Sequence, residues 1–261
     1  MTETLERGRM LSDNDLQSVL ELAKASDSVE LKLSLPEADQ RSTLVALGID
    51  PLDAQIRQVF FMDTPDLILN QAGIVVRARR VQGRSGDSTI KLRPVVPSEI
   101  PSNLRRMTGF GVEVDAMPGG YVCSASLKAP AENQRIKAAA SGEVRLRKLF
   151  SREQRDFYRG HAPDDIDLDS LTVLGPIFVL KEKWVPTGAG RPMTAEMWLY
   201  PDGSRFLEIS LRCMPRQAFQ IALETRVYLH SLGIDLSGEQ ETKTRKALEH
   251  FTQGTPAAHA I

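Results

Sequence analysis

The chain has 261 residues, of which 41% are hydrophobic and 26% charged, a composition that excludes disorder over most of its length and allows a substantial core. Its formal net charge of -1 excludes a global basic field, so an anion site must come from local clusters of Lys and Arg. The two cysteines, Cys123 and Cys213, form no CxxC motif, which argues against a zinc site and a disulfide framework. We interpret both as buried apolar residues.

The sequence gives no sign of a membrane or DNA partner. It contains no run of about 18 apolar residues, and residues 1–10 are charged rather than apolar as in a secretory signal. We therefore expect a cytoplasmic protein. The oligomeric state is left open.

The hydrophobic period changes at Ser28. Residues 1–27 predict a flexible segment followed by a helix, because apolar residues recur at near-helical spacing after several possible N-caps. From Ser28 the period is two, so Glu30 and Lys32 lie on one face of a strand and apolar residues lie on the other. This strand carries one charged face.

The following elements alternate between strands and helical segments. Period-two patterns bounded by turn residues predict strands at 28–33, 55–62, 73–81, 89–93, 110–116, 121–127, 177–185, 193–200 and 204–211. A flexible hairpin is expected at 83–87. Helical patterns occur within 36–49, 130–160 and 216–232, with Ser151 as a predicted N-cap and Gln154 in the first turn after it.

Two sets of strands separated by helices are compatible with one barrel or with two domains. No linker of Gly, Ser or Pro is long enough to require two domains, so we predict one barrel domain over 28–235, with a helical insertion near 130–160. Residues 1–27 precede this domain, and residues 236–261 are expected to form a C-terminal tail. The roles of 94–109 and 130–160 stay open.

Charged residues recur in pairs spaced by two along these strands, so both members of a pair face the same side. Such faces are usually solvated. Here, however, cations and acids are segregated by strand, and like charges on neighbouring strands are unfavourable unless an anion lies between them. The uncompensated cations are Arg77, Arg79, Lys91 and Arg93.

The opposite faces of the strands are apolar and need a cover, which the amphipathic helices can supply. We therefore place the helices outside a closed barrel and the charged side chains inside it. Arg and Lys in such an interior suit a chain of phosphates, and clustered carboxylates supply the oxygen ligands that Mg²⁺ or Mn²⁺ needs.

Six short segments resemble, in the same order, motifs of the CYTH family, also called the triphosphate tunnel metalloenzymes. The family includes inorganic triphosphatases, thiamine triphosphatases and class IV adenylate cyclases. The segments lie at 28–32, 61–67, 73–79, 90–94, 181–183 and 206–210. Each motif alone is weak, but six motifs in the family's order are specific, and the resemblance runs from about residue 28 to residue 232.

The resemblance implies an α+β fold, namely a closed eight-stranded antiparallel β-barrel with helices packed outside. It implies phosphate binding by Lys32, Arg77, Arg79, Lys91, Arg93, Lys181 and Lys183. It also implies Mg²⁺ or Mn²⁺ as the cofactor, with metal ligands among Glu30, Glu113, Asp115, Glu196 and Glu208. The residues expected to act directly in catalysis are Glu30, Lys32 and Glu208.

The sequence departs from the family pattern at two positions. The opening motif Glu-x-Glu-x-Lys has Ser28 in place of its first Glu, and the late Glu-x-Glu strand ends in Ser210. A serine hydroxyl brings no charge, so we expect one metal site to be weakened or lost. Binding should therefore survive better than turnover.

The expected function is that of a metal-dependent triphosphatase, which hydrolyses short inorganic triphosphate or a related triphosphate-containing small molecule. Trp184 and Trp198 are interpreted as packing residues rather than as stacking platforms. Two alternatives stay open. One is a class IV-type adenylate cyclase, in which the ribose hydroxyl of ATP attacks the α-phosphate. The other is a non-catalytic polyphosphate or nucleotide-binding protein, which Ser28 and Ser210 favour.

Overall fold

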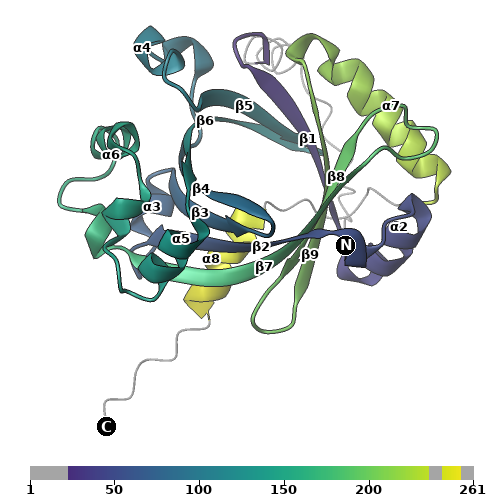
Figure 1. Cartoon of the computed structure of the whole chain (residues 1–261). Helices are drawn as coiled ribbons and strands as arrows, with labels where there is room; N and C mark the ends of the chain where they lie inside the picture. Colours follow the sequence, from purple (N-terminus) through teal and green to yellow (C-terminus); the bar gives the residue numbers. More distant parts are fainter. Residues whose placement is uncertain (1–22, 235–242, 254–261) are drawn as a thin grey trace, which may run out of the picture.

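A ring of nine strands forms the centre of the computed structural model, which describes residues 23–234 and 243–253 (Figure 1). The ring runs in the order β1-β5-β6-β4-β3-β2-β7-β8-β9 and is closed. The strands are β1 (Ser28–Leu35), β2 (Gln55–Asp63), β3 (Ile74–Val81), β4 (Arg84–Leu92), β5 (Phe110–Met117), β6 (Gly120–Ala131), β7 (Thr172–Trp184), β8 (Met193–Leu199) and β9 (Arg205–Cys213).

Most helices lie outside this ring, with α2 and α7 on one side and α5 and α6 on the other (Figure 1). The helices are α2 (Gln40–Leu47), α3 (Ile68–Gln71), α4 (Ser102–Arg105), α5 (Asn133–Ala140), α6 (Arg152–Arg159), α7 (Ala218–Ser231) and α8 (Lys243–Gln253). None of the described helices has both the length and the apolar character needed to cross a membrane. The helix predicted before residue 23 lies outside the described residues.

The barrel differs from the expected eight-stranded antiparallel barrel in strand number and in the direction of one pair. Each of the nine period-two segments forms a strand, whereas the number eight came from the family resemblance. Strands β1 and β5 pair in parallel, and the other neighbouring pairs are antiparallel. Directions cannot alternate all the way around a ring with an odd number of strands, so one pair must be parallel.

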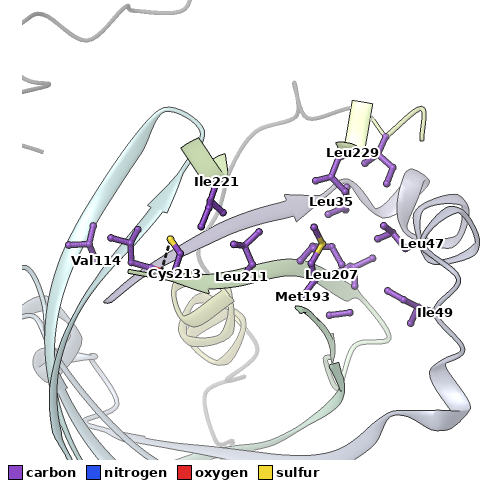
Figure 2. Close-up of a cluster of buried hydrophobic side chains, with 14 of the residues drawn as sticks. Leu35, Leu47, Ile49, Val114, Met193, Leu207, Leu211, Cys213, Ile221 and Leu229 are labelled. Atoms are coloured by element: carbon purple, nitrogen blue, oxygen red, sulfur yellow. Dashed lines mark hydrogen bonds between the residues drawn. The ribbon is translucent and has the colours of Figure 1, made fainter. Parts of the chain in front are cut away.

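Outward-facing apolar side chains hold α2 and α7 against the barrel, as the sequence predicted. Leu47 of α2 and Leu229 of α7 lie in one buried cluster with Leu207 and Leu211 of β9 (Figure 2). Cys213 belongs to the same cluster, and both cysteines are free and buried. On the other side of the ring, a second buried cluster joins α5 and α6 to β3, β4 and β6.

Helix α6 is fixed to the barrel by one buried amide. Ser151 Oγ accepts the backbone N–H of Gln154 at 3.2 Å, and Gln154 Oε1 accepts the backbone N–H of Ser151 at 3.0 Å, which confirms the predicted N-cap as a capping box. The Gln154 Nε2 donates to the carbonyl oxygens of Ser88 at 3.1 Å and Leu127 at 3.0 Å. A single side chain therefore joins α6 to β4 and β6.

Helix α8 packs against inward-facing residues of the barrel rather than against its outer surface. Its residues Ala247 and Leu248 are buried in a cluster with Val59 and Trp198, both of which line the barrel cavity. The sequence predicts a C-terminal tail here. Its apolar residues repeat at helical spacing, and the barrel interior offers them an apolar surface to cover. The division of the chain into domain and tail stays a prediction.

We expect Gln154→Leu to destabilise the fold by about 3 kcal/mol, because it leaves several buried polar groups unpaired. Ser151→Ala loses one capping interaction and should cost about 1 kcal/mol. Urea denaturation followed by circular dichroism measures both losses. Equal losses in the two variants would show that the contacts of the Gln154 amide with β4 and β6 contribute little.

Candidate functional site

The barrel encloses a cavity of about 620 Å³, a volume typical of small-molecule sites. Alternate residues of each strand face this interior, so the charged pairs spaced by two reach the same space. All the residues singled out in the sequence line the cavity, namely Glu30, Lys32, Arg77, Arg79, Lys91, Arg93, Glu113, Asp115, Lys181, Lys183, Glu196 and Glu208.

Acidic and basic side chains occupy opposite arcs of the cavity wall. Strands β8, β9, β1 and β5 are consecutive around the ring and contribute the acids Glu196, Glu208, Glu30, Glu113 and Asp115. Strands β6, β4, β3, β2 and β7 are also consecutive and contribute the cations Lys128, Lys91, Arg77, Arg79, Arg57, Lys181 and Lys183. The segregation by strand seen in the sequence becomes a segregation by half of the barrel. Lys32, Arg212 and Lys243 contact these acids, and Lys91 and Lys181 reach them from the basic arc.

The parallel pairing of β1 with β5 brings three carboxylates together. Its register places Glu30 opposite Asp115 and Ser28 opposite Glu113. One ligand oxygen from each of Glu30, Glu113 and Asp115 lies within 4.8 Å of the others. A cluster of carboxylate oxygens suits a hard divalent cation, so these three residues fit the expected Mg²⁺ or Mn²⁺.

The pKa values of Asp115 and Glu113 are shifted in opposite directions. Lys32 Nζ lies 2.9 Å from Asp115 Oδ1, and Lys91 Nζ lies 3.2 Å from Oδ2. Burial would raise the pKa of Asp115, but the two ammonium groups outweigh burial and hold this pKa at about 2. Burial and the charges of Glu30 and Asp115 instead raise the pKa of Glu113. Asp115 is therefore ionised at neutral pH, and Glu113 holds a proton more readily.

The two serines that depart from the family pattern both contact this cluster. Ser28 Oγ donates to Glu113 Oε1 at 3.4 Å, and Ser210 Oγ donates to Glu30 Oε1 at 3.4 Å. Each hydroxyl can orient a carboxylate without adding a charge. The loss of one metal site because of these serines stays a prediction.

On the basic arc, Arg77 has a buried nitrogen without a protein acceptor. Its Nε has no hydrogen-bond partner within the described residues. Burial, together with the nearby charge of Arg79, lowers the pKa of Arg77 to about 10. A bound anion would supply an acceptor and a compensating charge.

Arg79 differs from the sequence expectation because it has an acidic partner. Its Nε lies 3.0 Å and 3.2 Å from the two carboxylate oxygens of Asp87, which faces it across β3 and β4. Asp87 also lies 3.7 Å from Lys128 Nζ. The expectation of uncompensated cations was thus wrong for Arg79, because residues 83–87 were assigned to a flexible hairpin whereas β4 begins at Arg84. It was also wrong for Lys91, whose Nζ lies 3.2 Å from Asp115 Oδ2. Asp87 fixes the orientation of the Arg79 guanidinium.

Other residues that line the cavity do not belong to a pair of charged residues spaced by two along a strand. Arg57 is followed two positions later by Val59, so its strand shows no charged alternation although both line the cavity. Lys128 also lines the cavity, although the sequence alone does not decide between a place in the barrel interior and one on the surface. Arg147, in the segment 130–160 whose role the sequence leaves open, lines a separate cavity and pairs with Asp169 at 3.2 Å.

Glu196 and Glu208 lie opposite each other on β8 and β9 and contact lysines. Lys243 Nζ donates to Glu208 Oε1 at 2.7 Å and to Glu196 Oε2, while Lys181 Nζ donates to Glu196 Oε1. Burial would raise the pKa of Glu196, but Lys243 and Lys181 hold it well below its usual range. The sequence missed Lys243 because it lies in the expected tail.

Neither a family model nor a curated protein matches the sequence. Among solved structures, a putative adenylate cyclase from Bacillus halodurans aligns with a TM-score of 0.58 and 14% identity, over 85% of this chain and 97% of that one. A putative adenylyl cyclase from Hippeastrum, described as having a dominant triphosphatase activity, gives a TM-score of 0.59 and 17% identity, over 84% of this chain and 94% of that one. This chain has the CYTH fold. The resemblance seen in the sequence is therefore confirmed for the fold, and the CYTH barrel here is a mixed ring of nine strands.

Asp115 should stabilise this CYTH barrel in a pH-dependent way. Its pKa falls from an ordinary 3.8 to about 2, so its contribution is complete above about pH 4 and is lost as the pH falls through about 2. This shift corresponds to about 2.5 kcal/mol. Urea unfolding at a series of pH values should show that Asp115→Asn is less stable than the wild type above pH 4, and that the difference shrinks toward pH 2. A difference independent of pH would contradict this assignment.

Proposed function

We propose that this protein is a divalent-metal-dependent triphosphatase that hydrolyses short inorganic triphosphate, or a related triphosphate, inside its barrel. One observation carries the proposal, namely that a cationic arc faces a cluster of three carboxylates across a single cavity. A chain of phosphates has many non-bridging oxygens for Arg and Lys donors, and the carboxylates suit a divalent cation. The two arcs therefore complement the two parts of a metal–triphosphate complex.

The cationic arc would bind and orient the triphosphate. Arg77 would donate from its unpaired Nε, and Arg79, held by Asp87, would lose little freedom on binding. The ammonium groups of Lys91 and Lys181, which contact Asp115 and Glu196, would contribute further positive charge, with Arg93 and Lys183 adding to the same arc. Orientation and charge stabilisation are the main contributions that a protein makes to phosphoryl transfer.

The acidic cluster of Glu30, Glu113 and Asp115 would hold Mg²⁺ or Mn²⁺, which would neutralise charge on the transferring phosphoryl group. Lys32 lies at this cluster, with its Nζ 3.1 Å from Glu30 Oε2 and 2.9 Å from Asp115 Oδ1. From there its ammonium group can donate to a phosphate oxygen beside the carboxylates. We therefore propose Glu30 and Lys32 as the residues that act in catalysis, whereas Glu208 bonds to Lys243.

Two structural neighbours favour different reactions in the same kind of barrel. The Hippeastrum protein is described as having a dominant triphosphatase activity, which supports the hydrolase proposal. Both neighbours also carry a cyclase description, which keeps the cyclase as the second candidate. In both reactions the same cations would hold the phosphates. Water would attack the triphosphate in the hydrolase, whereas in the cyclase the ribose hydroxyl would attack the α-phosphate and pyrophosphate would leave.

Incubation of the protein with triphosphate, ATP or thiamine triphosphate, each with Mg²⁺ or Mn²⁺, tests the proposal. We expect orthophosphate from triphosphate, and no turnover after chelation of the metal. Cyclic AMP and pyrophosphate from ATP would replace the hydrolase by the cyclase. Tight triphosphate binding without any product would show that the protein binds triphosphate and does not hydrolyse it.

Arg77→Met should weaken triphosphate binding by about 30-fold, or about 2 kcal/mol, because a buried donor to the phosphates is lost. Arg80→Met is the matched control, since Arg80 lies on the same strand, donates to Gln58 and is not among the residues that line the cavity. Isothermal titration calorimetry with triphosphate measures both affinities. Equal affinities of the two variants would contradict the placement of the phosphates on the basic arc.

A further inference from the structure

Two of the expected metal ligands stand apart from the three-carboxylate cluster. Glu196 and Glu208 face each other across β8 and β9, and their side chains are only 7% and 3% exposed. Two buried carboxylates in such positions repel each other unless a cation lies between them. The ammonium group of Lys243 lies there and bonds to both.

The backbone of α8 fixes the position of this ammonium group. Lys243 is the first residue of the helix, and Ala247 and Leu248 bury the next turn inside the barrel. The Lys243 Nζ also lies 5.8 Å from the centre of the Trp198 ring, within the range of a cation–π interaction. Toward the other end of α8, His250 Nδ1 lies 3.3 Å from Asp202 Oδ2. Lys243 is thus part of a docked helix rather than a mobile surface side chain.

Both carboxylate oxygens of Glu196 are already bonded to lysines, so neither is free to bind a divalent ion. Lys181 contacts one oxygen and Lys243 contacts the other. A metal at Glu196 and Glu208 would have to displace the Lys243 ammonium group and compete with its full positive charge. The five expected metal ligands therefore do not act as one set. In the three-carboxylate cluster, lysines also contact both oxygens of Asp115, but among the ion pairs of the described residues Glu30 has a lysine on Oε2 alone and Glu113 has no lysine, so the cluster keeps oxygens for a metal.

We propose that Lys243 takes the place of a divalent cation at the Glu196–Glu208 pair, so that the protein binds metal only at the Glu30, Glu113 and Asp115 cluster. This proposal rests on the proposed function in one respect, the binding of a divalent metal in the barrel. Together with Lys181, the tethered ammonium of Lys243 balances the two acids at any metal concentration, and a chelator does not remove it. The Lys243 ammonium group can also donate a hydrogen bond to a phosphate oxygen. The two carboxylates alone would repel that oxygen.

Counting Mn²⁺ sites on the full chain, without triphosphate, tests the proposal. Isothermal titration calorimetry and electron paramagnetic resonance should find one site in the wild type and two in Lys243→Met, which removes the ammonium but keeps an unbranched side chain. Lys246→Met is the matched control on the same helix, because Lys246 Nζ lies 5.4 Å from the Phe206 ring and Lys246 is not among the residues that line the cavity. It should keep one site.

A second variant keeps the test informative if Lys243→Met does not fold. Glu208→Gln leaves Lys243 in place, so the wild-type number of one site should not change. Two sites in the wild type, an unchanged number in folded Lys243→Met, or loss of the single site in folded Glu208→Gln would overturn the proposal. The count is independent of hydrolysis, so one site without turnover would refute the triphosphatase and still support the role of Lys243.

Discussion

The parallel contact between β1 and β5 is the constraint on which the barrel and its site both depend. It closes a ring of nine strands and removes the two free edges that an open sheet would expose. Its register also sets Glu30 beside Asp115, and Ser28 beside Glu113. An antiparallel closure would have changed which residues of β5 face β1. The acidic cluster is therefore a product of how the ring closes.

Charge balance explains how the interior tolerates so many ionised groups. Asp115 pairs with Lys32 and Lys91, Asp87 pairs with Arg79, and Lys243 contacts the acids of β8 and β9. Burying any of these charged groups without its partner would be costly. On the basic arc, the Nε of Arg77 is buried without an acceptor among the described residues. Imbalance at this position is what makes the barrel suited to an anion.

Local patterns in the sequence predict the nine strands and place every candidate site residue in the interior, because a period of two reports directly on which side a residue faces. They carry no information on which distant strand becomes a neighbour, so the parallel pair and the acidic cluster it forms could not be derived. Asp87 was missed because Gly, Ser and Asp near Gly83 indicate a flexible turn, although the turn is only two residues long. Lys243 was missed because its partners are distant in sequence.

The neighbouring positions of β1 and β9 have a consequence for how the protein is made. Ser210 and Glu30 contact each other although they are 180 positions apart in the chain. During synthesis, β1 emerges from the ribosome long before its β9 partner exists, so the ring cannot close until most of the chain has been translated. Such distant pairings slow folding, and they expose the growing chain to aggregation in the meantime. Until β9 is translated, water can solvate the charged face of β1.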